Sequence, residues 1–363
     1  MTKRNLLPVN NELYTEADFM KDCPQSQFIP TTLGAVHRII AIGDIHGDLE
    51  LARRSFRLAK LIDNEDNWIA QPASTIVVQV GDQIDSCRPI PGVHQCHVKK
   101  SNDKAEDINV MEFFNRMHLL ASKVGGACYS LLGNHEIMNV QGNFNYVSYN
   151  NLYGFRYGEQ GLSAKKFEGP AGRKEAFGPG GPIASMLACT RTSILVIGSN
   201  MFVHAGLLPI LASKLEHLNL DSQTKLKYLN AVVRKWLLNK LSDAEIQTKK
   251  FMIDDINTSP FWTRIYGSIP PNVDLNSTAC FLEVKKALEV YKIGKMIVGH
   301  TPQPFTNETG INGTCYEAGR GNTLYRIDGG FSRAFEIFNN TWGIQVLEII
   351  DDKHFKIIME NAS

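Results

Sequence analysis

Five short motifs, each behind an apolar run, constrain this chain more than any other feature of its sequence. They are GDIHG (Gly43–Gly47), GDQID (Gly81–Asp85), GNHE (Gly133–Glu136), VHAG (Val203–Gly206) and VGHT (Val298–Thr301). Each carries an Asp, Asn or His directly after residues that favour a buried strand. A single such motif is ordinary turn chemistry. Five in order predict a cluster of polar side chains at the ends of strands.

The segments around the first three motifs alternate between strand and helix patterns. Val36–Ile42, Thr75–Val80 and Tyr129–Leu132 are apolar enough for buried strands. Between them, residues 49–62 and Ile108–Ala121 place apolar side chains at helical spacing. The order strand, helix, strand, helix, strand is typical of parallel βαβ units, so we expect an α/β fold.

The second half of the chain adds further elements around irregular stretches. The patterns predict a hairpin from Ile194–Ile197 and Met201–His204, helices at Ser222–Leu241 and Phe281–Tyr291, and strands at Lys295–Val298, Thr323–Ile327, Gly343–Ile350 and His354–Met359. Residues 1–33, which are polar and contain prolines, are expected to form an N-terminal arm. Residues 34–363 are expected to form a single domain with loop insertions near 86–107 and 143–181, the second over the mouth of the site.

Composition excludes several classes of protein. A net charge of +1 argues against a nucleic-acid or membrane-surface protein, which would usually carry a basic excess. No apolar stretch approaches the length that spans a bilayer. Seven cysteines without framework spacing fit a reducing compartment, so we expect free thiols and a cytoplasmic location.

The motif side chains form a set of metal-ligand chemistry. It consists of Asp44, His46, Asp82, Asn134, His204 and His300. Carboxylate, imidazole and amide oxygen suit Mn²⁺, Fe²⁺ or Zn²⁺, and the lack of thiolates disfavours a structural zinc cage. We expect one ion on Asp44 and His46 and a second on the Asn134 group, with the Asp82 carboxylate bridging the two.

Two motif residues are left over for proton transfer. His135, beside Asn134, is a spare imidazole that can protonate a leaving oxygen. Asp85, three residues after Asp82, is placed to orient it. The alternative is an ordinary side-chain hydrogen bond that stabilises the turn.

The ordered motifs resemble those of the calcineurin-like metallophosphoesterases, specifically the phosphoprotein phosphatases. GNHEIMNVQGNFNYVS, AFGPGGPIASMLA and PFWTRIYG are similar to the Shewanella-like protein phosphatases, and the resemblance runs from about Ile39 to Phe335. It implies a four-layer α/β/β/α sandwich (α+β), with two mixed β-sheets flanked by helices. It also implies two divalent metal ions, Mn before Fe or Zn, held by the six ligands above, with His135 and Asp85 as the acid pair.

One departure from the family pattern concerns the substrate phosphate. The family usually has GDxxDRG, whereas this chain has Asp85-Ser86-Cys87-Arg88, so its Arg comes two residues late. We expect the long side chain of Arg88 to reach the site if the loop bulges. Arg264, in PFWTRIYG, matches the family's second phosphate-binding Arg, and Asn134 is expected to contact the phosphate as well.

Other polar and aromatic residues have competing interpretations. Cys87, His94, Cys96 and His97 could hold zinc, and Cys87 with Cys96 could form a redox-sensitive pair, but free thiols and solvated imidazoles are favoured. Tyr149, Tyr153, Phe155 and Tyr157 could form a substrate platform or pack a lid. Asp328 resembles part of a family turn near the site, not a ligand.

These observations favour a metal-dependent phosphoprotein phosphatase. It would hydrolyse phosphotyrosine and/or phosphoserine/threonine by in-line attack of a metal-bridging hydroxide, with a phosphorylated protein or peptide as its partner. The sequence does not decide the oligomeric state. A dinucleoside polyphosphate hydrolase is the alternative, but it would need an adenine-stacking aromatic pair and clustered basic residues. A non-catalytic phosphate-binding scaffold is the third hypothesis, and the complete ligand set speaks against it.

Overall fold

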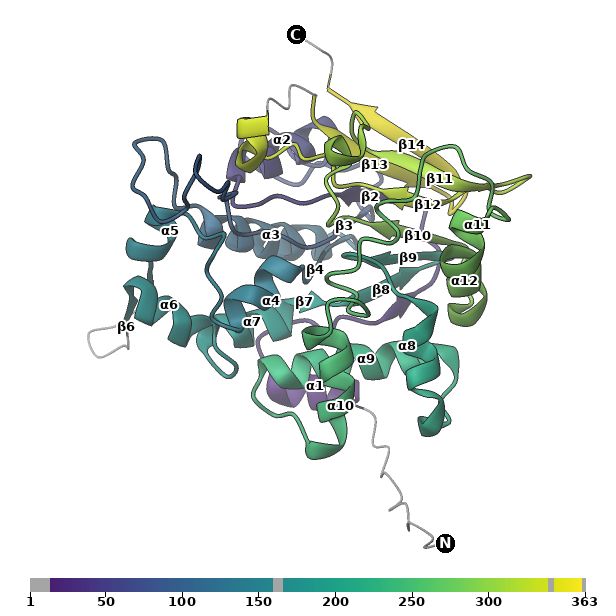
Figure 1. Cartoon of the computed structure of the whole chain (residues 1–363), viewed down its shortest axis with the longest axis horizontal. Helices are drawn as coiled ribbons and strands as arrows, with labels where there is room; N and C mark the ends of the chain where they lie inside the picture. Colours follow the sequence, from purple (N-terminus) through teal and green to yellow (C-terminus); the bar gives the residue numbers. More distant parts are fainter. Residues whose placement is uncertain (1–13, 159–165, 339–342, 361–363) are drawn as a thin grey trace, which may run out of the picture.

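Two six-stranded sheets face each other in the computed structural model, which describes residues 14–158, 166–338 and 343–360 (Figure 1). One sheet has the order β1 (Thr32–Leu33), β8 (Ile194–Ile197), β9 (Asn200–Val203), β10 (Lys295–Val298), β12 (Gly321–Arg326), β11 (Asn312–Glu317). The other has the order β14 (His354–Met359), β13 (Gln345–Ile350), β2 (Arg38–Ile42), β3 (Ile76–Gln79), β4 (Ala127–Leu131), β7 (Arg191–Thr192). Both sheets mix parallel and antiparallel pairs.

Alternation along β2 divides the core into layers. Ile39 and Ala41 face the sheet that contains β8, β9 and β10, and they pack with apolar residues of these strands. Ile40 and Ile42 point the other way, toward the helices α2 (Leu49–Leu58) and α3 (Asp107–Ser122). Successive side chains of a strand point to opposite faces, so a strand that is apolar throughout must be covered on both sides.

The outer face of the other sheet is covered in the same way. Its apolar side chains pack against helices α7 (Pro182–Thr190), α8 (Pro209–Lys214), α9 (Ser222–Leu237) and α12 (Lys286–Tyr291). The layers are therefore helix, sheet, sheet, helix. The expected four-layer sandwich of two mixed sheets is confirmed.

Strand register gathers the motifs at one edge. Ile42 of β2 pairs with Gln79 of β3, and Gln79 pairs with Ser130 of β4, all in parallel. In the other sheet β9 and β10 are also parallel, with Phe202 beside Ile297. The carboxyl ends of the five strands that precede the motifs therefore lie close together, as the sequence analysis predicts.

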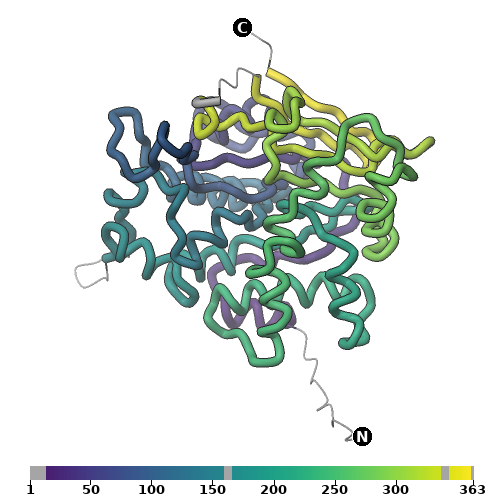
Figure 2. Tube along the Cα trace, in the orientation of Figure 1, coloured from purple at the N-terminus to yellow at the C-terminus, as the bar shows by residue number. Residues whose placement is uncertain are grey.

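The expected N-terminal arm packs against the rest of the domain from residue 14 onward. Helix α1 (Glu16–Asp22) buries Phe19 completely, and β1 pairs in parallel with β8. Figure 2 shows this purple start of the chain among the green segments of α9 and α10 (Ile246–Lys249). A seven-residue helix and a two-residue strand are too short to give a period in the sequence.

The two expected insertions differ from each other. Residues 86–106 have no helix or strand, only an isolated bridge between Ile90 and His94. The stretch 143–181, in which the sequence shows no period, contains α5 (Tyr149–Tyr153), β5 (Arg156–Gly158), β6 (Lys166–Glu168) and α6 (Gly169–Phe177). Short elements such as these fall below the length at which a pattern can be recognised.

Short helical turns complete the described chain. They are η1 (Glu216–Leu218), η2 (Asp243–Glu245), η3 (Lys250–Asp254), α11 (Thr278–Cys280), η4 (Phe281–Lys285), η5 (Gln303–Thr306) and η6 (Arg333–Phe338). The helix expected at Phe281–Tyr291 is thus divided between η4 and α12. Within the described ranges, no helix combines the length and the apolar character that crossing a membrane requires.

The expectation of free thiols is wrong for six of the seven cysteines. Disulfides join Cys23 to Cys189, Cys87 to Cys96 and Cys280 to Cys315, and Cys128 remains a buried free thiol. Pairing of Cys87 with Cys96 also removes the zinc alternative for that loop. The first bridge spans 166 positions, so only the fold brings its partners together. Disulfides persist mainly in oxidising compartments, which leaves the expected cytoplasmic location without support from the cysteines.

Candidate metal centre

The turns that carry the motif residues have backbone conformations that few side chains adopt. His46, Asp82, Asp85 and His300 have φ values of 48°, 53°, 73° and 66°, in the left-handed region. A non-glycine residue there costs about 1–2 kcal/mol, and such residues persist only where the surroundings over-determine them. Strain of this kind clusters at functional sites, and here it collects at one edge of the sandwich.

The turns after β3 and β4 touch so closely that only glycine fits between them. A Cβ on Gly133 would lie 2.1 Å from Asp82 Oδ1. Glu136, in the first turn of α4 (Asn134–Val140), accepts the backbone N–H groups of Asp82 (3.0 Å), Gln83 (2.9 Å) and Gly133 (2.7 Å). Its buried carboxylate therefore ties both turns together, a role that the sequence analysis did not assign to it.

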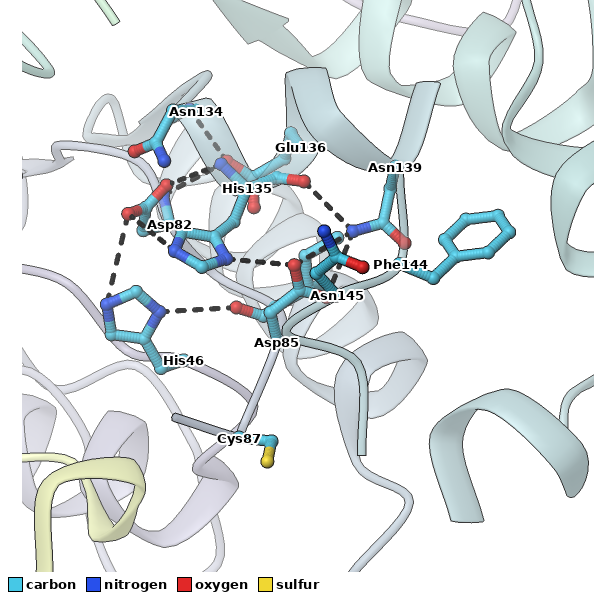
Figure 3. A network of polar contacts seen from close by, with 12 residues as sticks. His46, Asp82, Asp85, Cys87, Asn134, His135, Glu136, Asn139, Phe144 and Asn145 are labelled. Carbon is cyan, nitrogen blue, oxygen red and sulfur yellow. Dashed lines mark hydrogen bonds and ion pairs between the residues drawn. The ribbon is translucent and has the colours of Figure 1, made fainter. Parts of the chain in front are cut away.

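Asp82 contacts several histidines, and Figure 3 shows it beside His46 and His135. Its Oδ2 is 3.3 Å from His204 Nε2, 3.8 Å from His135 Nε2 and 3.9 Å from His46 Nε2. The ligand atoms of His46, Asp82 and His135 lie within 4.8 Å of one another, and so do those of Asp82, His204 and His300. Asp82 belongs to both groups, which is the position that a bridging carboxylate needs.

Backbone carbonyls determine which nitrogen of each histidine faces the cluster. The pairs are His46 Nδ1 with Ile84 O at 3.3 Å, His204 Nδ1 with Val80 O at 2.8 Å, and His300 Nε2 with Trp262 O at 3.0 Å. A ring nitrogen that faces a carbonyl carries the proton, so the other nitrogen has the lone pair. Nε2 of His46 and His204 and Nδ1 of His300 are therefore available to a metal ion.

Asn134 and Asp44 complete the six expected residues. Asn134 Oδ1 is 2.9 Å from both His204 Nε2 and His300 Nδ1. Asp44 Oδ2 accepts the backbone N–H of His300 (3.0 Å) and lies 3.8 Å from His46 Nε2. The structure therefore brings together Asp44, His46, Asp82, Asn134, His204 and His300, which we call the metal cluster.

Unpaired oxygens show that the cluster fits cations. Among the described residues, Asp44 Oδ1 and Asp328 Oδ2 are buried and have no hydrogen-bond partner. Buried polar atoms are normally paired, and two neighbouring carboxylates repel each other, so this pair of oxygens fits a cation. Asp328 was predicted to be a turn residue near the site, and its burial beside Asp44 agrees with that place.

The electrostatics of the cluster favour the protonation states of metal ligands at His46, His300 and Asp82. Burial would lower the pKa of His204, but the Asp82 carboxylate outweighs this effect, so that pKa is raised instead. Burial and the Arg88 charge lower the pKa of His46 well below its ordinary value, and burial with His204 does the same for His300. Both shifts favour the neutral ring, which is the form that binds a metal ion. Burial would raise the pKa of Asp82, but the surrounding histidines, His204 foremost, hold it well below the ordinary value. Burial, followed by the charges of Asp328 and Asp82, raises the pKa of Asp44, as expected for crowded carboxylates.

The expected acid pair is in hydrogen-bond contact. His135 Nδ1 lies 2.8 Å from Asp85 Oδ2, while Nε2 of the same ring faces Asp82. Asn139, one turn further along α4, donates to both Asp85 oxygens at 2.9 and 3.0 Å (Figure 3). Asp85 is fully buried and His135 is 6% exposed. The imidazole is therefore held from behind, with one edge directed at the metal cluster.

Both expected phosphate-binding arginines line a cavity of about 190 Å³ above the cluster. Arg88 donates from Nη1 to the carbonyls of Asp85 (3.0 Å) and Cys87 (2.8 Å), and its guanidinium lies 4.6 Å from the Phe335 ring. Arg264 donates from Nη1 to the His300 carbonyl at 3.1 Å. The irregular loop therefore brings Arg88 to the cavity in spite of its shifted position.

Aromatic side chains form much of the cavity wall, and sequence reasoning did not find them. They are Tyr146, Trp262, Phe305 and Phe335. None of the four aromatic residues expected as a platform or lid, Tyr149, Tyr153, Phe155 and Tyr157, is among the described residues that line this cavity. The one available signal was Trp262, two residues before Arg264 in PFWTRIYG.

A comparison with family models matches residues 37–304 to the calcineurin-like phosphoesterases. An uncharacterized protein of Acanthamoeba polyphaga mimivirus is 59% identical over 249 residues, 68% of this chain and 98% of that protein. Shewanella-like protein phosphatase 2 of Arabidopsis thaliana is 28% identical, over 93% of this chain and 81% of its own length. The resemblance to Shewanella-like phosphatases is confirmed.

Solved structures share the fold. The cold-active protein-tyrosine phosphatase of a psychrophilic Shewanella superimposes with a TM-score of 0.59 at 19% identity, over 92% of this chain and 83% of that one. At this identity the likeness concerns the fold alone.

Proposed function

The chain belongs to the calcineurin-like phosphoesterase family, and from that premise we propose that it is a metal-dependent protein phosphatase that prefers phosphotyrosine. The observation that carries the proposal is the position of Asp82, shared by two groups of histidines beneath a cavity lined by two arginines. The relative from Arabidopsis thaliana that is named as a protein phosphatase supports it.

The metal cluster would hold two divalent ions. Asp44 and His46 would bind one ion, Asn134, His204 and His300 would bind the other, and Asp82 would bind both. When bound, such ions activate a water and neutralise phosphate charge. The chain's own residues bind, orient and donate protons. Mn²⁺ is our first choice of metal, with Fe²⁺ or Zn²⁺ as alternatives, because the donor set is oxygen and imidazole.

Arg88 and Arg264 would bind the phosphate oxygens from the cavity walls, and Asn134 would contribute its amide. A guanidinium offers paired N–H donors that match phosphate geometry. His135 then gives its Nε2 proton to the leaving oxygen as the phosphorus–oxygen bond breaks, and that oxygen keeps the bonding electron pair. Asp85 stabilises the protonated ring before the transfer.

The aromatic walls favour a tyrosyl substrate. Its ring can pack against Tyr146, Trp262, Phe305 or Phe335, and each aromatic pair adds about 0.5–1.5 kcal/mol beyond burial alone. A phosphoserine or phosphothreonine would have to bring its backbone between the same walls. Arg88 and Arg264 are the only Lys or Arg side chains among the described residues that line the cavity, which disfavours a polyphosphate chain.

The experiment is a comparison of turnover on three substrates with added Mn²⁺. They are a phosphotyrosine peptide, the same peptide with phosphothreonine, and diadenosine tetraphosphate. We expect the highest kcat/KM on the phosphotyrosine peptide. Preference for the nucleotide would overturn the proposal in favour of a polyphosphate hydrolase, and inactivity on all three would favour the scaffold hypothesis.

A further inference from the structure

A buried arginine lies behind the acid pair, although it belongs to none of the five motifs. Arg173 of α6 is 0% exposed. It donates from Nε to Asn139 Oδ1 (2.9 Å), from Nη1 to the Asn151 carbonyl (3.1 Å) and from Nη2 to Asp107 Oδ2 (2.8 Å). Its guanidinium also lies 4.7 Å from the Phe177 ring. Every arm of the group is therefore committed inside the protein.

Two of these partners lead directly to Asp85. Asn139 donates from Nδ2 to both carboxylate oxygens of Asp85 and to the His135 carbonyl. Asp107 accepts the backbone N–H of Asp85 at 3.1 Å. Arg173 Nη2 itself is 3.7 Å from Asp85 Oδ1. The side chain and the backbone of Asp85 are thus held by groups that Arg173 orients.

The amide of Asn139 explains why the arginine matters. An amide has an acceptor at one end and donors at the other, and a half turn exchanges them. Arg173 donates to the oxygen of Asn139, which leaves the NH₂ group for Asp85. Without that donor, the amide can turn its oxygen toward the Asp85 carboxylate, and the two would repel.

Charge gives a second reason. Asp85, Asp107 and Arg173 are all 0% exposed. Buried charges are expensive unless they are paired, and a fully buried arginine is rare for that reason. The guanidinium of Arg173 neutralises one of the two carboxylates, which leaves one negative charge. The neighbouring group that can neutralise this charge is the His135 ring, when it is protonated.

We infer that Arg173, with Asp107 and Asn139, is a positioning residue that keeps Asp85 and His135 in the geometry for protonating the leaving oxygen. We call Arg173, Asp107, Asn139, Asp85 and His135 the acid network. The inference rests on the proposed function. It also gives the stretch 143–181 a task, because α6 delivers Arg173 from inside it.

The test is a leaving-group comparison on Arg173→Met. Phenyl phosphate has a poor leaving group that needs a proton, whereas 2,4-dinitrophenyl phosphate has a good one that does not. We expect kcat to fall about 100-fold on the first substrate, within the range of general acid catalysis, and by less than about threefold on the second. KM and bound metal should stay within about twofold of the wild-type values.

Arg234→Met is the matched control. Arg234 is also buried, donates from Nε to the Ala188 carbonyl at 2.9 Å, and lies 5.1 Å from the Phe19 ring. Its loss should lower stability without changing the ratio of the two rates. Equal losses on both substrates in Arg173→Met would show that Arg173 is only structural and would overturn the inference.

Asn139→Leu keeps the test decisive if Arg173→Met folds poorly, because it is close in size and removes the same link to Asp85. It should show the same selective loss, and a uniform loss would overturn the inference. In a His135→Asn background, neither change should alter the ratio further. A wild-type protein that hydrolyses neither aryl phosphate would instead refute the proposed function, so the two failures are distinguishable.

Discussion

The metal cluster and the acid network are neighbours, yet their polar atoms are satisfied in opposite ways. In the metal cluster, Asp44 Oδ1 has no hydrogen-bond partner among the described residues, and His46 Nε2 lies 3.9 Å from Asp82 Oδ2, too far for a hydrogen bond. In the acid network, both Asp85 oxygens accept hydrogen bonds of 3.0 Å or less. Groups that await an external ligand are left open, and groups that must hold one geometry are saturated by the protein.

The difference teaches where each region obtains its stability. An open cluster of charged and polar atoms is costly to bury until a cation enters. A saturated network is stable without any ligand, but it loses more than one bond when one member is removed. Substitutions in the two regions should therefore fail in different ways.

The largest effect is expected for Asp82→Asn, which removes the carboxylate shared by both groups of histidines. Turnover should fall by more than about 10⁴-fold, because binding and orienting both ions depend on that group. Bound metal, measured by elemental analysis, should fall as well. A variant that keeps two ions and measurable turnover would show that the two regions do not differ as described.

Removal of the metal ions should affect the stability of the metal cluster but not that of the acid network. A ligand at 100 times its Kd stabilises the native state by about 2.7 kcal/mol. Chelation should therefore lower the free energy of unfolding by about that amount for each ion bound, measured by denaturant titration. Asp82→Asn should respond little to the chelator, and Arg173→Met should respond like the wild type. A wild-type protein indifferent to Mn²⁺ would contradict the cation site.

His135→Asn tests the acid side of the comparison. Metal content should be unchanged, and turnover should fall about 100-fold on esters with poor leaving groups. The loss on p-nitrophenyl phosphate should be smaller, because its leaving group needs less help from a proton. Equal losses on all esters would count against His135 as the acid.

The last prediction concerns the dependence of stability on pH and the carboxyl group of Asp107. Burial raises the pKa of Asp107 from 3.8 to about 6, with Arg173 opposing it. Between about pH 4 and 6 the native state therefore binds more protons than the unfolded state, so this contribution to stability is present at low pH and lost as pH rises through about 6. Relative to Asp107→Asn, the wild type should lose about 3 kcal/mol across that window.

Denaturant titrations of the metal-free proteins at several pH values measure this difference. Parallel stability profiles for the two proteins would mean that Asp107 titrates alike in the folded and unfolded states. Burial within the acid network would then carry no free-energy cost for the ionised carboxylate of Asp107.

The sequence by itself predicted the buried strands and the polar residues that follow them from local patterns, and the resemblance of those motifs to a known family implied the sandwich. Strands such as Thr75–Val80 show their burial in composition, and parallel pairing carries the residue behind each strand to a common edge. Asp82 and His135 could therefore be recognised before any coordinates, and the structure brings them together.

Only the tertiary structure decided which side chains from distant segments contact one another. Arg173 reaches Asp107 across 66 positions, and Cys23 reaches Cys189 across 166. No period or spacing relates such pairs, since their contact depends on how helices from distant parts of the chain pack, as α6 does against α4, α5 and α7. Local patterns fix which residues follow a strand, whereas packing fixes which remote side chains support them.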